Sequence, residues 1–427
     1  MKVAIAGLGY VGLPLARQFV RGGVDVVGLD IDQSKVDALK AGKTYIKHIP
    51  ASEIVEMNES GRFEPTTNFS AIEAVDAVLI CVPTPLSKHR EPDLSYVIAT
   101  AEGIAPHLSK GTLVTLESTT YPGTTDGELR EAIEKGSDLV AGEDFHLAYS
   151  PEREDPGNAT SVEAIPKLVG GLTEDCRDRA VEVYGKAIDA IVPVANCRVA
   201  EAAKLTENIF RSVNIAMVNE LKVIFDKMDM NVWDVIDAAA TKPFGFMPFY
   251  PGPGLGGHCI PIDPFYLTWK AREFGKHTRF IELAGEINAG MPAYVVFKVA
   301  EALNASAKSV RGSRVLVIGL AYKGGVDDMR ESPSFTLMDH LAAQGAEVRY
   351  YDPFIPEIGP TREHARWTGA KSIEWTGTEL AGFDAALIST DHPEMDYQLL
   401  IDSIDTVIDT RNALAKAGLE AKDMWKA

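Results

Sequence analysis

The chain has 427 residues, 46% hydrophobic and 24% charged, which is typical of a globular protein with two or three domains. Its formal net charge of −19 disfavours nucleic acid and anionic membranes as partners. No apolar run approaches the roughly 20 residues that a membrane-spanning helix needs. The four cysteines, Cys81, Cys176, Cys197 and Cys259, have neither a disulfide nor a zinc-type spacing. We therefore expect a cytoplasmic protein with reduced thiols.

The first half of the chain alternates short β-branched runs with helical stretches, which is the pattern of a parallel sheet with helices on both faces. The runs predicted as strands are residues 2–7, 24–30, 76–82, 111–119 and 145–152. From about Val199 to Ala239 apolar residues recur at helical spacing, which predicts one long helix or two. Residues 279–303 predict another helix, and the alternating pattern returns near residue 312.

The sequence after residue 312 resembles the start of the chain. The N-terminal KVAIAGLGYVG is echoed by RVLVIGLAYKG, so that Gly319 corresponds to Gly7, and VDAVLICVPTP is echoed by FDAALISTDHP. A divergent duplication explains this repeat, and so does convergence on the composition of buried strands. We predict an α/β protein with two Rossmann-like doubly wound domains joined by a central helical domain. The predicted boundaries are 1–195, 196–305 and 306–427.

A dinucleotide-binding motif follows the first predicted strand. It is GLGYVG, from Gly7 to Gly12, and it directly precedes a predicted helix whose N-terminus would attract a pyrophosphate. Asp30 ends the next strand, 23 residues after Gly7, near the spacing of about 20 residues at which an acidic side chain binds the ribose. A carboxylate there repels a 2′-phosphate, which favours NAD over NADP. Lys35 is either a solvated helix residue or a cation that tempers this repulsion, and a glycine turn without a ligand is the alternative.

Ligands of doubly wound sheets bind beyond the carboxyl ends of the strands, where VPTP and STTYPG also lie. The residues expected to hold NAD from this region are Gly7, Leu8, Gly9, Tyr10, Val11, Gly12, Asp30, Lys35, Val82, Pro83, Thr84, Ser118 and Thr119.

The segment PGPGLGGHCIPIDP, residues 251–264, places Cys259 on a loop, because its prolines exclude a helix interior or a central strand. Beside an NAD domain, a loop thiol suggests aldehyde oxidation through a thiohemiacetal and a thioester. This chemistry needs a base and groups that stabilise an oxyanion. Lys204 and Asn208, four residues apart, share one helix face and could hold the oxyanion, while Asp263 and Glu152 are candidate acids.

The same residues also fit ordinary structural roles. Lys204 and Asn208 could be a solvated or capping pair, Asp263 an N-cap or turn residue, and Glu152 a surface charge. His258 could lower the pKa of the neighbouring thiol, although adjacent side chains often point apart. A metal site of Cys, His and Asp is a further alternative, but we expect no metal.

Eight motifs occur in order along the chain: GLGYVGLP, VPTP, STTYPG, SPERED, EAAKLTEN, PGPGLGGHCIPIDP, GLAYKGGVDDMRESPS and DTRN. Together they resemble the UDP-glucose/UDP-N-acetylmannosamine dehydrogenase family over essentially the whole chain. The cysteine loop and the following residues are most similar to the bacterial UDP-N-acetylglucosamine 6-dehydrogenases. UDP-glucose dehydrogenases typically have phenylalanine and serine at the positions of Leu255 and His258.

The resemblance implies that a UDP-sugar is oxidised at C6 to a carboxylate with two NAD⁺ and no metal. It implies that Cys259 is the nucleophile and that Lys204 and Asn208 stabilise the oxyanion. It implies that Asp263 assists water and thiol, that Glu152 takes part in thioester hydrolysis and that Thr119 positions water. It implies substrate contacts by Glu152, Arg153, Lys204, Asn208, Lys242, Tyr250, Gly252, Gly254, Gly256, Lys323 and Arg411, and a cofactor contact by Arg330.

One departure from the family concerns Lys242, in TKPFGF. The family commonly has an arginine in this region that reaches the substrate of a neighbouring subunit, and lysine lacks the bidentate fork of arginine. The resemblance also implies a homodimer built on the central helices, or a dimer of dimers.

We predict a UDP-N-acetylglucosamine 6-dehydrogenase, with UDP-N-acetylmannosamine, UDP-N-acetylgalactosamine and UDP-glucose as alternative substrates. A two-electron hydroxyacid dehydrogenase would need no loop cysteine. A non-catalytic NAD-binding scaffold would bind cofactor without turnover, and would have no reason to keep Cys259, Lys204, Asn208 and Asp263 together.

Overall fold

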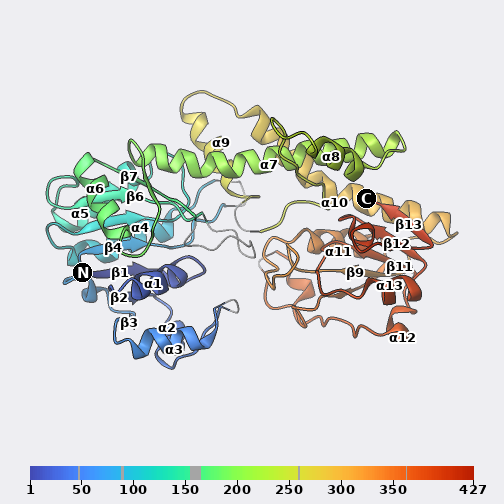
Figure 1. The fold of residues 1–427 in the computed structure, drawn as a ribbon, viewed down its shortest axis with the longest axis horizontal. Helices are drawn as coiled ribbons and strands as arrows, with labels where there is room; N and C mark the ends of the chain where they lie inside the picture. The colour runs from blue at the N-terminus through green and yellow to red at the C-terminus, as the bar shows by residue number, and fades with distance from the viewer. Residues whose placement is uncertain (47–48, 88–90, 154–164, 258–259, 362) are drawn as a thin grey trace. The chain divides into compact units, whose positions relative to one another are not determined.

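The computed structural model describes residues 1–427 except 47–48, 88–90, 154–164, 258–259 and 362 (Figure 1). The described chain divides into two compact units. The first consists of Met1–Glu207 and Phe265–His277, and the second of Asn208–Pro264 and Thr278–Ala427. The predicted α/β architecture, with two Rossmann-like sheets and a central helical region, is confirmed. The three domain ranges, 1–195, 196–305 and 306–427, stay a prediction.

In the described part of the first unit, the strands form an 8-stranded sheet in the order β3-β2-β1-β4-β5-β6-β7-β8. The strands are β1 (Lys2–Ala6), β2 (Asp25–Leu29), β3 (Phe63–Thr66), β4 (Ala77–Ile80), β5 (Leu113–Leu116), β6 (His146–Tyr149), β7 (Lys167–Gly171) and β8 (Ile191–Pro193). The five predicted strands correspond to β1, β2, β4, β5 and β6. The sheet is not parallel throughout, because β7 runs antiparallel to β6. This strand, KLVGG, was missed because its lysine and two glycines obscure the apolar pattern.

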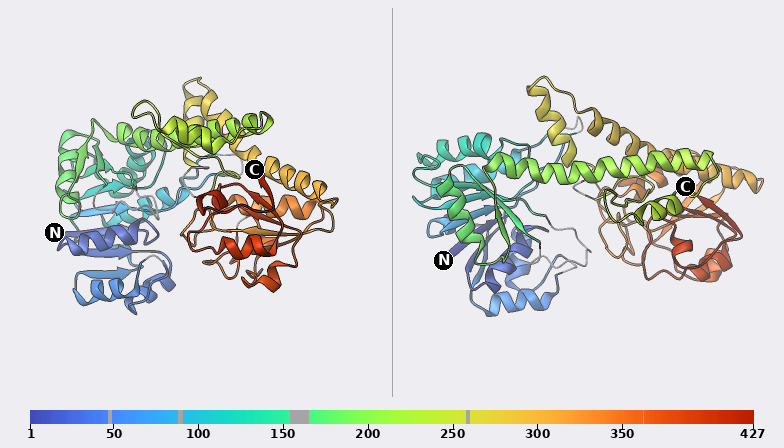
Figure 2. Two further views of the ribbon diagram at one scale, coloured as in Figure 1. Left: turned by 45° about the vertical axis from the view of Figure 1, so that its right-hand side comes forward. Right: turned by 45° about the horizontal axis from the view of Figure 1, so that its top comes forward.

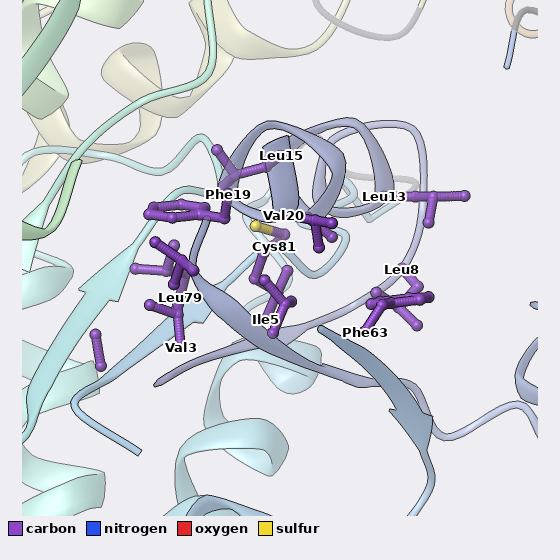
Figure 3. Packing of buried hydrophobic residues seen from close by; sticks show 14 of the residues in the cluster. Val3, Ile5, Leu8, Leu13, Leu15, Phe19, Val20, Phe63, Leu79 and Cys81 are labelled. Atoms are coloured by element: carbon purple, nitrogen blue, oxygen red, sulfur yellow. The ribbon is translucent and has the colours of Figure 1, made fainter. Parts of the chain in front are cut away.

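Helices cover both faces of this sheet, because the strands send alternate apolar side chains to opposite faces. Val3 and Ile5 of β1 pack in one cluster with Phe19 of α1 (Gly12–Arg21), as Figure 3 shows, and with α6 (Glu174–Tyr184). Ala4 belongs to the cluster that contains residues of α4 (Ser95–Ile104) and α5 (Arg130–Ser137). Two further α-helices of this region are α2 (Gln33–Lys40) and α3 (Ala51–Glu59).

The central helical region begins with α7 (Cys197–Lys227), a continuous helix of 31 residues that can be followed in both views of Figure 2. It is followed by α8 (Val232–Ala240), α9 (Asp263–Glu273) and α10 (Arg279–Ala305). The predicted helices over 199–239 and 279–303 are confirmed as α7, α8 and α10. Within the described part of this region, α9 is a helix that the sequence pattern does not predict, because it starts inside the proline-rich segment.

The described strands of the second unit form a 5-stranded parallel sheet in the order β10-β9-β11-β12-β13. They are β9 (Arg314–Ile318), β10 (Glu347–Tyr351), β11 (Ala385–Ile388), β12 (Thr406–Asp409) and β13 (Asp423–Lys426). Residues of α10 and α11 (Pro333–Ala343) belong to one core cluster with this sheet. Residues of α12 (Gly377–Leu380), α13 (Tyr397–Ser403) and α14 (Ala413–Lys416) belong to a second cluster.

The two sheets repeat one local construction, as the internal sequence repeat predicts. The order β2-β1-β4-β5 matches β10-β9-β11-β12, and Gly7 and Gly319 both have positive φ, +97° and +83°. In both, the N–H after this glycine donates to the carboxylate at the end of the next strand. The distances are 2.9 Å to Asp30 and 2.7 Å to Asp352.

Candidate active site

The GLGYVG turn has the geometry of a pyrophosphate-binding turn. A Cβ on Gly7 would lie 2.5 Å from the carbonyl oxygen of Cys81, and a Cβ on Gly12 would lie 1.9 Å from that of Gly7. Only glycine therefore fits at these two positions. A Cβ on Gly9 would meet nothing within 4 Å, so the turn has open space beside it. Since α1 begins at Gly12, its N-terminal N–H groups are available for an anion.

The other residues of this turn have different surroundings. Leu8 is buried in the core, Tyr10 is exposed, and Val11 immediately precedes α1. We therefore expect contacts from Leu8 and Val11 to come from their backbone, because their side chains belong to or pack against the sheet core.

The buried carboxylate of Asp30 is held on both oxygens. Its Oδ2 accepts from the N–H of Leu8 at 2.9 Å, and its Oδ1 accepts from that of Asp32 at 3.0 Å. The Nζ of Lys35 lies 3.1 Å from Oδ2 and 5.8 Å from the centre of the Tyr45 ring. The Lys35 ammonium is therefore paired with Asp30, and its part in the choice of cofactor stays a prediction. The turn and this acid fit NAD.

The VPTP and STTYPG segments, which follow β4 and β5, are hydrogen-bonded to each other. The Thr84 hydroxyl donates to the carbonyl of Thr119 at 2.7 Å, and the Ser118 hydroxyl donates to that of Val82 at 2.7 Å. Pro83 is exposed between them. The structure thus brings together the VPTP and STTYPG segments as predicted.

The STTYPG segment is supported by Glu201, a buried acid that no sequence motif singles out. Glu201, in the first turns of α7, accepts from the N–H of Gly123 at 2.7 Å and from the N–H and hydroxyl of Thr125 at 2.9 and 2.7 Å. Burial raises the pKa of Glu201 to about 7, although these three donors act in the opposite direction.

The candidate acid Glu152 follows β6, and its neighbour Arg153 is paired rather than solvated. Arg153 Nη2 lies 2.7 Å from Glu207 Oε1, and its N–H donates to Glu152 Oε1 at 2.6 Å. The Nζ of Lys167 lies 3.8 Å from Glu152 Oε2. The Glu152 side chain is 22% exposed and has charged partners, so it is not an isolated surface charge.

The Lys204 and Asn208 side chains are both buried, which excludes a solvated pair. Asn208 donates from Nδ2 to Asp263 Oδ2 at 2.6 Å. Asp263 is also buried and is the first residue of α9. The structure therefore joins two of the predicted catalytic residues directly. Cys259 and His258 lie outside the described residues.

The loop before the cysteine is held by a chain of buried amides. Asn219 accepts from the N–H of Gly252 at 3.0 Å and donates to Asn288 Oδ1 at 2.8 Å. At the start of the loop, the Tyr250 hydroxyl donates to Asp237 at 2.6 Å. No sequence motif singles out Asn219 or Asn288, since each is one polar residue in a helical pattern.

The predicted sugar-nucleotide arginine, Arg411, lies against this loop. A Cβ on Gly252 would be 2.5 Å from its Nη1, so glycine is needed for the guanidinium to come this close. Its Nε donates to the carbonyl of Ser389 at 2.8 Å. Burial lowers the pKa of Arg411, while Asp391 and Asp409 act in the opposite direction.

The remaining predicted contacts are spread over the second unit. Gly254 lies beside Pro292 and Pro333, and Gly256 beside Tyr322, close to the half-buried Lys323. Arg330 pairs with Asp328, 2.6 Å from Nη2 to Oδ2, and its carbonyl accepts from the N–H of Gly257 at 3.3 Å. Lys242 is exposed, with Nζ 4.9 Å from the centre of the Phe244 ring.

The second Rossmann-like domain lacks features of the first domain's dinucleotide site. Asp352 is the counterpart of Asp30, and its carboxylate lies 3.0 Å from His392 Nε2. It also accepts from the N–H of Ala321 at 2.9 Å, and Ala321 stands where the first domain has Gly9. Its helix α11 begins only at Pro333, several residues beyond the turn. A ribose would have to compete with His392 for this carboxylate.

Within the described ranges, no three His, Cys, Asp or Glu side chains are grouped so that they could hold a metal ion. None of the helices in these ranges combines the length and the apolar character needed to cross a membrane.

Comparison with known proteins places the chain in a family over most of its length. Three models of the UDP-glucose/GDP-mannose dehydrogenase family match it: the NAD binding domain over residues 1–188, the central domain over 198–290 and the UDP binding domain over 316–416. The predicted cofactor, NAD, is thereby confirmed.

Individual relatives match over nearly their whole length. A UDP-N-acetyl-D-glucosamine 6-dehydrogenase of Pseudomonas aeruginosa is 37% identical, over 92% of this chain and 91% of the relative. A UDP-N-acetyl-D-mannosamine dehydrogenase of Salmonella typhi is also 37% identical, over 92% and 94%. The structure of the UDP-D-ManNAc dehydrogenase of Pyrococcus horikoshii matches with a TM-score of 0.88 and 32% identity, over 100% of this chain and 99% of the other. The chain therefore belongs to the UDP-glucose/GDP-mannose dehydrogenase family and is an NAD-dependent dehydrogenase of nucleotide sugars.

Proposed function

We propose that the substrate is UDP-N-acetylglucosamine and that its C6 alcohol is oxidised by four electrons to a carboxylate. The similarity of the cysteine loop to bacterial UDP-N-acetylglucosamine 6-dehydrogenases supports this choice, as does the Pseudomonas aeruginosa relative. UDP-N-acetylmannosamine is the second candidate, because the Salmonella typhi relative has the same identity.

The buried Asn208–Asp263 bond is the observation that best supports covalent catalysis, since it sets two polar groups of the predicted catalytic set in a fixed geometry. Bound NAD supplies the hydride acceptor for both oxidations. The Cys259 thiolate adds to the C6 aldehyde, and its sulfur carries first the thiohemiacetal and then the thioester. Lys204 and Asn208 stabilise the oxyanion of the adduct.

Hydrolysis of the thioester completes the reaction. Glu152 accepts a proton from a water molecule that Thr119 positions, and the water oxygen adds to the thioester carbonyl carbon. The carbon–sulfur bond then breaks, its electron pair returns to Cys259, and the carboxylate is released. Asp263 assists proton transfer to water and thiol.

We assign the UDP moiety to the glycine loop 250–256 together with Lys323 and Arg411, because a diphosphate needs cations and close backbone approach. We assign Arg330 to the cofactor. Lys242 supplies a phosphate contact in the place of the family's arginine, without bidentate geometry.

A panel of UDP-hexoses tests the substrate proposal. The enzyme should form two NADH per molecule of UDP-N-acetylglucosamine, with a higher kcat/KM than for UDP-N-acetylmannosamine, UDP-N-acetylgalactosamine or UDP-glucose. A higher kcat/KM for UDP-N-acetylmannosamine would select the second candidate, and one NADH per sugar would overturn the four-electron reaction.

Two variants of the ribose site should change cofactor selectivity in opposite directions. Asp30→Ala should weaken the binding of NAD by roughly 10–100-fold, as expected for the loss of a hydrogen bond to a charged group. It should also narrow the preference of the enzyme for NAD over NADP. Lys35→Ala should widen that preference by a few fold, because the partly exposed cation no longer tempers Asp30. KM for both cofactors is the measurement, and Lys40→Ala, at the exposed end of α2, is the control. Equal use of NAD and NADP by the wild type would contradict the ribose assignment.

We also propose a homodimer that uses an apolar stripe of α7. Phe210, Met217 and Ile224 recur every seven residues and are 49%, 45% and 45% exposed, a pattern that favours helix–helix association. Light scattering should give about twice the 46.2 kDa of one chain, and a monomer at working concentration would contradict the proposal.

A further inference from the structure

A buried charged cluster adjoins Glu152 and has no part in the reaction described above. Glu117 follows β5, Lys167 begins β7 and Tyr184 ends α6, and they are 1%, 5% and 0% exposed. Lys167 Nζ lies 2.6 Å from Glu117 Oε2, and the Tyr184 hydroxyl donates to Glu117 Oε1. The ammonium also lies 5.2 Å from the centre of the Tyr184 ring.

The position of this cluster relates it to Glu152. Because β6 lies between β5 and β7, the Glu117–Lys167 pair spans the end of β6, where Glu152 follows. The ammonium reaches the Pro151 carbonyl at 3.4 Å and Glu152 Oε2 at 3.8 Å. The other oxygen, Oε1, accepts from the N–H of Arg153 at 2.6 Å. Both carboxylate oxygens of Glu152 therefore have a positioning partner.

A buried ion pair is poor evidence for a role in stability, because well-packed apolar residues often serve as well. Glu117 is placed to anchor Lys167 rather than to reach Glu152 itself. Burial alone would lower the pKa of Lys167, but Glu117 and Glu152 raise it above its usual value. The side chain therefore stays a cation next to the candidate base.

We propose that Lys167, anchored by Glu117 and Tyr184, is a positioning residue that holds the Glu152 carboxylate for hydrolysis of the Cys259 thioester. This inference rests on the proposed function. In the hydrolytic step, the Glu152 carboxylate must be aimed at water, and a fixed cation 3.8 Å from one of its oxygens restricts its orientation. The two oxidations precede this step and do not use Glu152 as a base.

The variant Lys167→Met separates hydrolysis from oxidation. Rapid-quench assays with NAD and the UDP-sugar should show an undiminished burst of two NADH per site, followed by a kcat lowered roughly 10–100-fold. Mass spectrometry should then show the acyl group accumulating on Cys259. Lys167→Arg should restore most of kcat.

Two controls keep the outcomes distinct. The double variant Glu117→Gln/Lys167→Met leaves no unpaired buried charge, so it should fold even where Lys167→Met does not, and should still accumulate the acyl-enzyme. Lys110→Met removes an exposed ion pair with Asp144 in the same unit and should leave kcat unchanged. Loss of the NADH burst together with kcat in the folded double variant, or an unchanged kcat, would overturn the proposal. Absence of two NADH per sugar in the wild type would instead overturn the proposed function.

Discussion

Cys259→Ala should abolish formation of the uronic acid while leaving the first oxidation possible. The first oxidation needs a base and an oriented alcohol, but no covalent bond to the enzyme. The second needs a tetrahedral adduct, which the thiolate forms with the aldehyde. The variant should therefore give at most one NADH per sugar. Loss of the associated oxyanion stabilisation alone costs roughly 10²–10³ in rate.

The reaction of the Cys259→Ser variant should stop at a later step than that of Cys259→Ala. The hydroxyl can form the corresponding oxygen ester, which hydrolyses much more slowly than a thioester, so mass spectrometry should detect an adduct at position 259. Cys197→Ala is the matched control: this thiol is buried, its pKa is raised by that burial, and it donates to the carbonyl of Gly170. Full turnover to the acid by Cys259→Ala at a near wild-type rate would exclude the covalent mechanism.

The local motifs could be predicted from sequence because each is specified by neighbouring residues. Strand β4 and the part of β1 after Lys2 are continuous apolar runs, and Gly12 of the GLGYVG turn is required by its close contact with the carbonyl of Gly7. The pairing of the VPTP and STTYPG segments follows from strand order, since carboxyl ends of adjacent parallel strands meet at one edge of the sheet.

The buried polar networks could not be predicted in this way. Asn219 and Asn288 are 69 positions apart, and Glu117 and Lys167 are 50 apart. Each of these residues taken alone has the pattern of a solvated side chain or a strand end. Their burial depends on tertiary packing, and only the packed structure shows that the polar group has a partner.

The environment of Lys35 cannot be predicted from sequence for a related reason. Spacing placed it on a helix after Asp30, but the direction of a long flexible side chain depends on its surroundings. In the structure the Tyr45 ring and the Asp30 carboxylate both attract its ammonium group. The antiparallel direction of β7 also cannot be predicted from the sequence, because residue periodicity carries no information on strand direction.

Asp263→Asn should lower kcat by roughly 10²–10⁴, the range for loss of a positioned acid or base, with a much smaller change in stability. The substitution keeps the volume at a buried site but removes the negative charge. It retains an amide oxygen that can accept from Asn208 Nδ2 in place of the carboxylate oxygen, which now accepts at 2.6 Å. The measurement is kcat and KM together with the thermal midpoint of unfolding.

Asp263→Ala provides the comparison for stability. It leaves the buried Nδ2 donor of Asn208 without this acceptor, which costs about 1–3 kcal/mol, and it removes a carboxylate from the first turn of α9, where the helix dipole favours negative charge. Asp263→Ala should therefore lose stability as well as activity, whereas Asp263→Asn should lose mainly activity. If Asp263→Asn kept kcat within a few fold of the wild type, Asp263 would be a structural partner of Asn208 at the start of α9, and the proton transfer would have to be assigned to another residue.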